Sequence, residues 1–220
     1  MTDAGPGAPG ASLVGLGDLN ELELDALRVC GHIGAGRAAT SLSAMIGVPV
    51  GMQVPAVKLL PLDAVADEVG GPEALVVAIY LRVTGDADGH ILFVMPPETG
   101  HSLVEPLLCG MPAGEIDAAG FGDMERSALQ EVGNILTSSY LIALTEMTGL
   151  FMEPTPPAIG IDMAGGLLAQ VLCEVAMTGD YALVIETAFD EVGDPVPGAF
   201  VFIPTPQALG KVLSGLGLTR

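Results

Sequence analysis

Three polar residues, Ser127, Glu131 and Asn134, are spaced four and three positions apart in a stretch with helical periodicity. At 100° per residue they fall within about 60° of one another on a helix, and the apolar Leu129 and Val132 fall on the opposite side. We therefore expect Glu131 and Asn134 to point into solvent. There a carboxylate can pair with a cation, and an amide can both donate and accept hydrogen bonds. An ordinary solvated helix face would have the same spacing, so the spacing alone leaves both interpretations open.

The composition excludes several classes of protein. Half of the 220 residues are apolar and the mean hydropathy is +0.57, which excludes a disordered chain. The longest apolar run, residues 74–81, is far shorter than the roughly 20 residues of a membrane-spanning helix. Residues 1–17 lack the features of a secretory signal, and we interpret them as a flexible leader. Three cysteines without regular spacing indicate neither disulfides nor a zinc site, so we expect a cytoplasmic protein.

The charge is strongly negative. The 27 acidic and 7 basic residues give a formal net charge of −20, which repels nucleic acid and anionic membrane surfaces. We therefore expect no nucleic-acid partner and no membrane partner. The acidity would attract a protein with a basic surface, but it could equally serve to keep an apolar protein soluble.

The chain resembles itself when it is shifted by 102 residues. This shift places Gly31 on Gly133 and Pro55 on Pro157, and a shift of 108 aligns residues 91–96 with 199–204. We interpret the chain as two repeats, at about 18–110 and 120–220, which form a single domain over residues 18–220.

Each repeat has the pattern of a long helix, then strands, then a short helix. In the first repeat we expect a helix at 18–46, an extended stretch at 48–60, a hairpin of 74–83 with 90–95, and a helix at 97–108. In the second repeat we expect a helix at 122–148, strands at 167–176, 181–189 and 198–203, a turn at 190–195, and a helix at 206–216. These elements predict an α+β protein in which two long, pseudo-symmetric helices pack on a largely antiparallel sheet.

The spacing of Ser127, Glu131 and Asn134, together with residues elsewhere in the chain, resembles that of a known family. The pattern Ser127-x-x-x-Glu131-x-x-Asn134, followed after 22 residues by Pro157, is similar to the signature of the CheC, CheX and FliY chemotaxis phosphatases. Further matches to CheC are Gly133-Asn134-Ile135, the stretch His32-Ile-Gly-Ala-Gly36 with Ala38-Ala-Thr40, Leu60-Pro-Leu62, and Val83-Thr-Gly-Asp86. The resemblance covers residues 21–218, so it implies an internally duplicated CheC-like fold.

The resemblance also implies an activity, the dephosphorylation of the aspartyl phosphate on a CheY-like receiver domain. The receiver would hold the Mg²⁺, and this chain would need no cofactor. Because phosphoryl transfer to water requires mainly positioning, Asn134 would orient the attacking water without a repelling charge. Glu131 would pair with a lysine of the receiver. Ser127 would be a docking contact, and Pro157 would shape the strand after the helix.

The first repeat departs from this pattern. The same spacing gives Asp25, Val29, His32 and Pro55, so a valine replaces the glutamate and a histidine replaces the asparagine. Valine cannot form the ion pair, and we predict that this degenerate site is inactive. It could be a vestigial copy kept for the fold, or a pH-tuned site in which His32 positions the water.

A second function remains open. Relatives of CheC also bind the deamidase CheD, and FliY-like proteins belong to the flagellar switch, so the chain could be a non-catalytic adaptor for phosphorylated CheY, CheD or the switch. His90 and His101 have no third ligand at metal spacing, so we expect no metal site in this chain.

Overall fold

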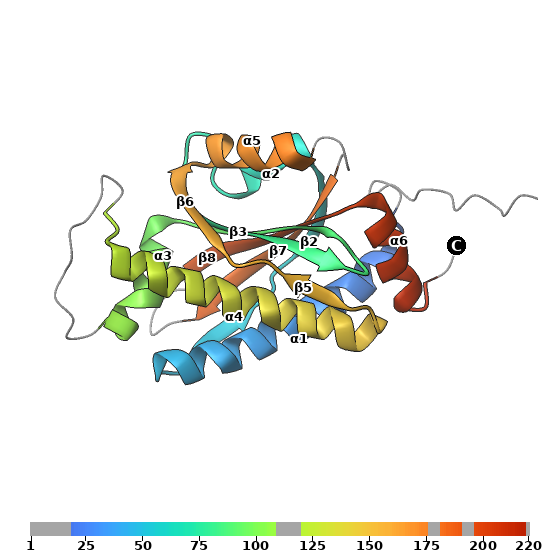
Figure 1. Ribbon diagram of the computed structural model, residues 1–220, viewed down its shortest axis with the longest axis horizontal. Coiled ribbons are helices and arrows are strands. Elements are labelled where there is room, and N and C mark those ends of the chain that lie inside the picture. Colours follow the sequence, from blue (N-terminus) through green and yellow to red (C-terminus); the bar gives the residue numbers. More distant parts are fainter. Residues whose placement is uncertain (1–18, 109–119, 176–180, 191–195, 219–220) are drawn as a thin grey trace, which may run out of the picture.

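The computed structural model describes residues 19–108, 120–175, 181–190 and 196–218, and its elements follow the same order in each half of the chain (Figure 1). The first half contains α1 (Glu21–Ile46), β1 (Gly51–Gln53), β2 (Val57–Pro61), the 3-10 helix η2 (Leu62–Ala64), α2 (Val65–Glu68), β3 (Leu75–Gly85), β4 (Gly89–Met95), α3 (Pro97–Val104) and the 3-10 helix η3 (Glu105–Leu108). The second half contains α4 (Asp123–Thr148), β5 (Met152–Pro154), β6 (Ala158–Met163), α5 (Ala164–Val175), β7 (Tyr181–Asp190), β8 (Val196–Pro204) and α6 (Pro206–Gly215).

The two halves share one antiparallel sheet. Its strand order is β1-β7-β8-β4-β3-β5, with β2 also paired to β7 and β6 also paired to β3. The first two strands of each half therefore pair with the third strand of the other half, and β4 joins β8 at the centre. Each half completes the sheet of the other, so the two long helices rest on a common support.

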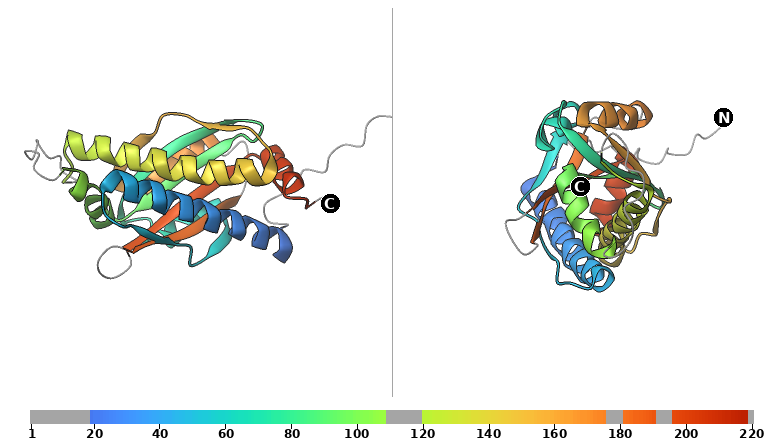
Figure 2. Two further views of the ribbon diagram at one scale, coloured as in Figure 1. Left: turned by 90° about the horizontal axis from the view of Figure 1, so that it is seen from below. Right: turned by 90° about the vertical axis from the view of Figure 1, so that its left-hand side faces the viewer.

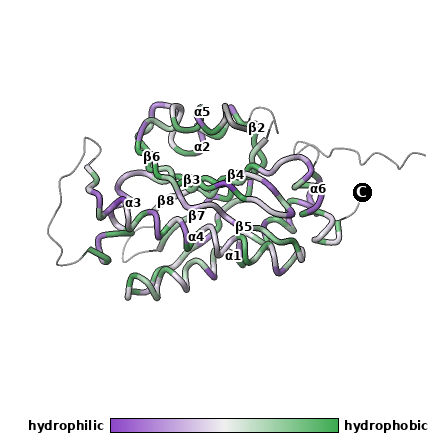
Figure 3. Tube along the Cα trace, in the orientation of Figure 1, coloured by the Kyte–Doolittle hydropathy of each residue, from purple (hydrophilic) through white to green (hydrophobic). Residues whose placement is uncertain are grey.

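The sheet lies between two layers of helices. Figures 1 and 2 show α1 and α4 side by side on one face and α2 and α5 over the other, and Figure 3 shows apolar residues along the central strands. The sheet has a hydrophobic core on each face, and alternate residues of β3 belong to one core or the other. Ile79 and Leu81 pack against α1 and α4, while Val76 and Ala78 pack against α2 and α5. A strand that is buried on both faces needs no polar alternation, which explains the unbroken apolar run at 74–81.

Local signals set the ends of both long helices. The Asn20 side-chain oxygen accepts a hydrogen bond from the backbone N–H of Glu23 at 3.1 Å. The Glu23 carboxylate accepts one from the backbone N–H of Asn20 at 2.7 Å. This capping box satisfies two amides that the first turn would leave unpaired. Each helix ends at a glycine with positive φ, Gly47 at 80° and Gly149 at 73°. The predicted long helices, the hairpin of β3 and β4, and the α+β class are confirmed.

One predicted strand is wrong. Residues 167–176 were expected to be extended, but most of them belong to helix α5. Leu168 and Ala164 pack on the outer face of the sheet, and the positions of Leu167 and Val171 also fit a helical period. A short apolar run cannot be assigned to a strand or a helix by hydrophobicity alone, because both bury it.

Some sequence predictions lie outside the described residues. They concern the leader at 1–17, most of the turn at 190–195 and most of the junction between the repeats at 110–120. In the part of the chain that the structure covers, no helix is both long enough and apolar enough to cross a bilayer.

Glycine brings α4 very close to β3. A Cβ added at Gly133 would lie 2.4 Å from Cγ2 of Ile79, far inside van der Waals contact, whereas one added at Gly36 on α1 would meet nothing within 4 Å. The contact at Gly133 fixes the height of α4 above the sheet next to Asn134.

We expect Gly133→Ala to lower the free energy of unfolding by about 1–3 kcal/mol, because the methyl group overpacks against Ile79. Gly36→Ala is the matched control. It should raise stability by about 0.5–1 kcal/mol, because alanine restricts the unfolded chain and fits the helix. Urea unfolding of both variants measures the difference, and equal stability would contradict the close contact.

Candidate functional site

The candidate site lies on the solvent face of α4 and consists of Ser127, Glu131 and Asn134, here called the α4 site. Glu131 is exposed and Asn134 is half-buried, while Leu129, Val132 and Leu136 on the opposite side are buried under the sheet. The orientation expected from the helical period is therefore correct.

Neither the Glu131 nor the Asn134 side chain is bonded to another side chain or to the backbone in the part of the chain that the structure describes. Among the described residues, the Glu131 carboxylate and the Asn134 amide form no hydrogen bond or ion pair. Three other acids on the long helices are paired: Asp25 with Arg28, Glu146 with Arg37 at 2.5 Å, and Glu125 with His101 at 3.2 Å. A free carboxylate and a free amide one turn apart are available to a partner molecule.

A groove of about 200 Å³ runs beside these side chains, at the boundary between α4 and α1. This α4 groove is lined by Ser41 from α1 and by Glu131, Asn134, Ile135, Ser138, Ser139 and Ile142 from α4. Its rim is partly apolar, because Ile142 is 47% exposed. The groove gives the α4 site a shallow hollow that both polar and apolar side chains line.

Ser127 and Pro157 take different places beside the α4 site. The Ser127 hydroxyl is exposed and donates to the Asp123 carbonyl at 2.9 Å, which leaves its oxygen able to accept a bond from a partner. Pro157 lies in the bend between β5 and β6, and its carbonyl accepts a bond from the Gln130 amide at 3.3 Å. The bend is thereby attached to α4 next to Glu131.

The equivalent surface of the first half, here called the α1 face, consists of Asp25, Val29 and His32. All three are exposed, and Val29 is 49% exposed. Asp25 is paired with Arg28 through a short contact. Pro55, between β1 and β2, is exposed as well. The α1 face therefore occupies the same position on its helix as the α4 site does on α4. It has an apolar side chain and an imidazole where the α4 site has a carboxylate and an amide.

The interface between α1 and α4 is closely packed and apolar. The helices run antiparallel, with Gly34 against the Tyr140 ring, while the Cys30 sulfur lies 3.3 Å from that of Met147. Burial raises the pKa of the Cys30 thiol to about 11, and burial also raises the pKa of the Tyr140 hydroxyl. Both groups stay protonated and neutral, so they support the helices and supply no nucleophile to the groove.

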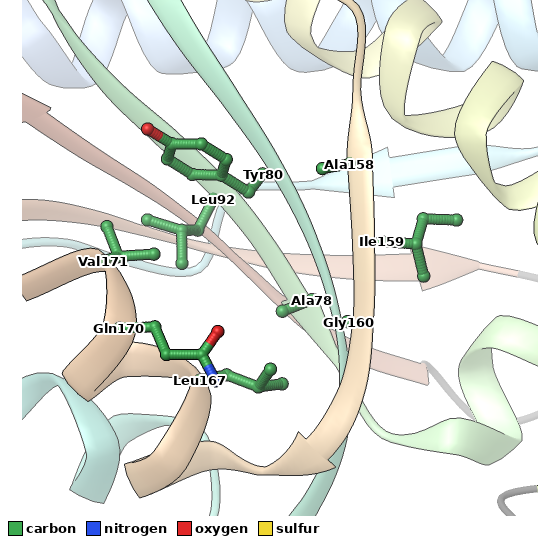
Figure 4. Close-up of a pocket in the computed structure, with 9 residues that line it drawn as sticks. All are labelled: Ala78, Tyr80, Leu92, Ala158, Ile159, Gly160, Leu167, Gln170 and Val171. Carbon is green, nitrogen blue, oxygen red and sulfur yellow. The ribbon is translucent and has the colours of Figure 1, made fainter. Parts of the chain in front are cut away.

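A second cavity lies on the other side of the sheet. It has about 180 Å³ and is lined mainly by apolar side chains of β3, β4, β6 and α5, as Figure 4 shows. The sheet separates it from the α4 site. Tyr80, on its wall, has its hydroxyl 2.8 Å from Nδ1 of His90, so that pair supports the sheet surface.

The remaining candidates for metal ligands do not gather. His101 stacks on Phe121, with ring centroids 4.0 Å apart, and contacts Glu125 at the start of α4. Within the described ranges, no three His, Cys, Asp or Glu side chains are grouped so that they could hold a metal ion.

Comparisons with known proteins agree with this fold and show the family of the chain. A model of the CheC-like family matches residues 124–161, which include Ser127, Glu131, Asn134 and Pro157. The CheY-P phosphatase CheC of Bacillus subtilis (strain 168) is 35% identical over 201 residues, which cover 90% of this chain and 96% of that protein. The chain therefore belongs to the CheC-like family.

Solved structures show the same architecture at lower identity. FliY of Thermotoga maritima superposes with a TM-score of 0.71 at 19% identity, covering 92% of this chain and all of that one. A chain in the FliG–FliM complex from H. pylori superposes with a TM-score of 0.65 at 11% identity, covering 87% of this chain and 99% of that one. These two structures therefore share the fold of this chain.

Sequence reasoning missed part of the groove. Ser138 follows Asn134 by four residues and falls at about 20° on the same helical count, so a longer count along the helix would have found it. Ser41 belongs to α1, and no spacing within α4 could have indicated it. Only the packing of the two helices brings Ser41 into the groove.

Because the side chains of Glu131 and Asn134 form no bond with any other residue that the structure describes, we expect Glu131→Ala and Asn134→Ala to change the free energy of unfolding by no more than about 0.5 kcal/mol. Leu136→Ala is the matched control on the buried side of α4 and should lose about 2–5 kcal/mol. Urea or thermal unfolding makes the comparison. A large loss of stability at Glu131 or Asn134 would show that these residues are structural.

Proposed function

We propose that this protein is a phosphatase that hydrolyses the aspartyl phosphate of a CheY-like receiver domain at its α4 site. The single observation that carries the proposal is the pair of Glu131 and Asn134, whose side chains line the α4 groove together and form no bond with any other described residue. The relationship to the CheY-P phosphatase CheC of Bacillus subtilis supports the same substrate class.

The reaction requires little covalent chemistry from the phosphatase. The water oxygen forms a bond to phosphorus while the bond from phosphorus to the aspartyl oxygen breaks. Aspartate and inorganic phosphate result, and the water proton leaves with phosphate or solvent. Such a step depends mainly on in-line positioning and on stabilisation of charge. In this proposal the receiver brings its own Mg²⁺ with the phosphoryl group, as part of the substrate.

Asn134 is assigned the role of orienting the attacking water. Its amide carries no charge to repel the phosphoryl oxygens, and it can accept a bond from the water while its NH₂ donates to a phosphoryl oxygen. Its half-buried position restricts the side chain, so the water is held in one direction. A flexible exposed amide would lose more conformational entropy on reaching that geometry.

Glu131 is assigned the docking of the receiver. It is exposed, unpaired and one turn from Asn134, so an ion pair with a lysine beside the phosphorylation site would set the approach of Asn134. Ser127 extends the contact by one further turn, and Pro157 holds the β5–β6 bend against α4 through Gln130.

Phosphate release from a phosphorylated, Mg²⁺-bound CheY-like receiver tests the proposal. The wild type should accelerate release. Asn134→Ala should lower kcat by about 10²-fold, the effect of removing one hydrogen-bonding group directed at the reacting centre. Glu131→Ala should mainly raise KM, by about tenfold, and the effect should shrink at high salt.

Val29→Ala and His32→Ala are the matched controls, because they alter the equivalent positions of the α1 face. Both should retain wild-type hydrolysis. Absence of acceleration by the wild type would refute the phosphatase function. Loss of activity in His32→Ala with activity retained in Asn134→Ala would move the working site to α1. Binding of the phosphorylated receiver without hydrolysis would favour the adaptor function.

The inactivity assigned to the α1 face also has a direct test. In an Asn134→Ala background, the double change Val29→Glu with His32→Asn restores both functional residue types on α1. We expect recovery to about a tenth of the wild-type rate, because a water-orienting amide is present again. Continued inactivity would show that the α1 face differs from the α4 site in more than these two side chains.

A further inference from the structure

Two serines that line the α4 groove have hydroxyls without a hydrogen bond to any other residue that the structure describes. The buried hydroxyls of Thr137 and Tyr140 also lack a partner among the described residues, but they do not line the groove. Five Ser and Thr hydroxyls on α1 and α4 donate to the carbonyl four residues earlier, as is usual within helices; they are Thr40, Ser43, Ser127, Ser139 and Thr148. Ser41 and Ser138 have no hydrogen-bond partner among the described residues. Both line the groove beside Asn134.

From this juxtaposition we propose that Ser41 and Ser138 are positioning residues, whose hydroxyls hold the water that Asn134 orients for attack. The inference rests on the proposed function and deepens it. Asn134 would act on the reacting water, and the serines would act through that water and the water behind it.

The size of the groove supports this assignment. A single water occupies about 30 Å³ of liquid and is held by two to four polar partners, so a groove of about 200 Å³ can hold several waters. One amide cannot supply all of those partners. Ser138 stands one turn beyond Asn134 on the same helix, and Ser41 approaches from α1, so their hydroxyls supply further partners from two directions.

The other half of the chain offers an internal comparison. The 102-residue shift places Gly36 at the position of Ser138 and Ala143 at the position of Ser41. Neither residue has a hydroxyl. The α1 face therefore lacks the equivalents of Asn134, Glu131, Ser138 and Ser41, whereas all four line the α4 groove, Ser41 from α1 and the others from α4.

The assignment leaves the covalent step unchanged. Water still attacks phosphorus and aspartate still leaves, and the serine hydroxyls form and break only hydrogen bonds. Loss of one neutral hydrogen bond to the water should lower the rate by about threefold to tenfold. It should not weaken docking, because the contact assigned to docking is Glu131.

Steady-state phosphate release from the phosphorylated, Mg²⁺-bound receiver tests the inference in the full chain. Ser138→Ala and Ser41→Ala should each lower kcat by about threefold to tenfold with KM unchanged. Ser138→Thr, which keeps a hydroxyl, should retain most of the activity. Thr40→Ala is the matched control, because it removes a hydroxyl from the residue next to Ser41 that is bonded internally to Gly36; it should keep wild-type kcat.

A double variant separates positioning from a general structural effect. In the Asn134→Ala background, Ser138→Ala should cause no further loss, since the serine acts through the water that Asn134 orients. An additional loss as large as in the wild-type background would overturn the inference. A raised KM with unchanged kcat would also overturn it, because the serines would then be docking contacts.

The outcomes distinguish the two proposals. If the wild type does not hydrolyse the receiver phosphate, the proposed function fails and this inference fails with it. If the wild type is active and Asn134→Ala is not, while both serine variants keep the wild-type kcat, only the inference is overturned.

Discussion

α1 and α4 pack closely against each other and against a shared sheet, and this packing determines where every other part of the α4 site lies. Gly133 allows α4 to rest on Ile79, and Gly34 allows α1 to approach Tyr140 of α4. Because these contacts leave no space for a side chain, each helix is fixed in both height and rotation. The same rotation that buries Leu129 and Val132 turns Glu131 and Asn134 outward.

Because the two halves share one sheet, the packing of each half constrains the other. β1 and β2 pair with β7, and β5 and β6 pair with β3, so neither half has a complete sheet without the other. The α4 groove follows the same rule, because its wall includes Ser41 from the first half. A change in one half can therefore alter the site carried by the other, through the position of α1 or through the side chain that α1 contributes.

The two halves have similar backbones but different exposed side chains on their long helices. α1 and α4 begin 102 residues apart and have the same length, and both end at a glycine with positive φ. Their exposed faces differ, because packing constrains a solvent-facing side chain weakly while the buried side of each helix must still fit the sheet. The first half thus supports the α4 site even though its own face carries Val29 and His32.

Residue patterns alone were enough to predict the two long helices, the hairpin of β3 and β4, and the outward direction of Glu131 and Asn134. Helical period, caps and apolar runs are local properties, so they can be recognised in the sequence without knowledge of tertiary contacts. The resemblance to CheC-type phosphatases suggested roles for the residues of that face. The short apolar stretch of α5 misled the prediction, because a strand and a helix can bury such a stretch equally well. Three features could be learned only from tertiary contacts: which strands pair across the halves, that the Glu131 and Asn134 side chains bond to no other described residue, and that Ser41 lines their groove. Those facts depend on residues distant in the chain, which meet only when the core closes between the helices and the sheet.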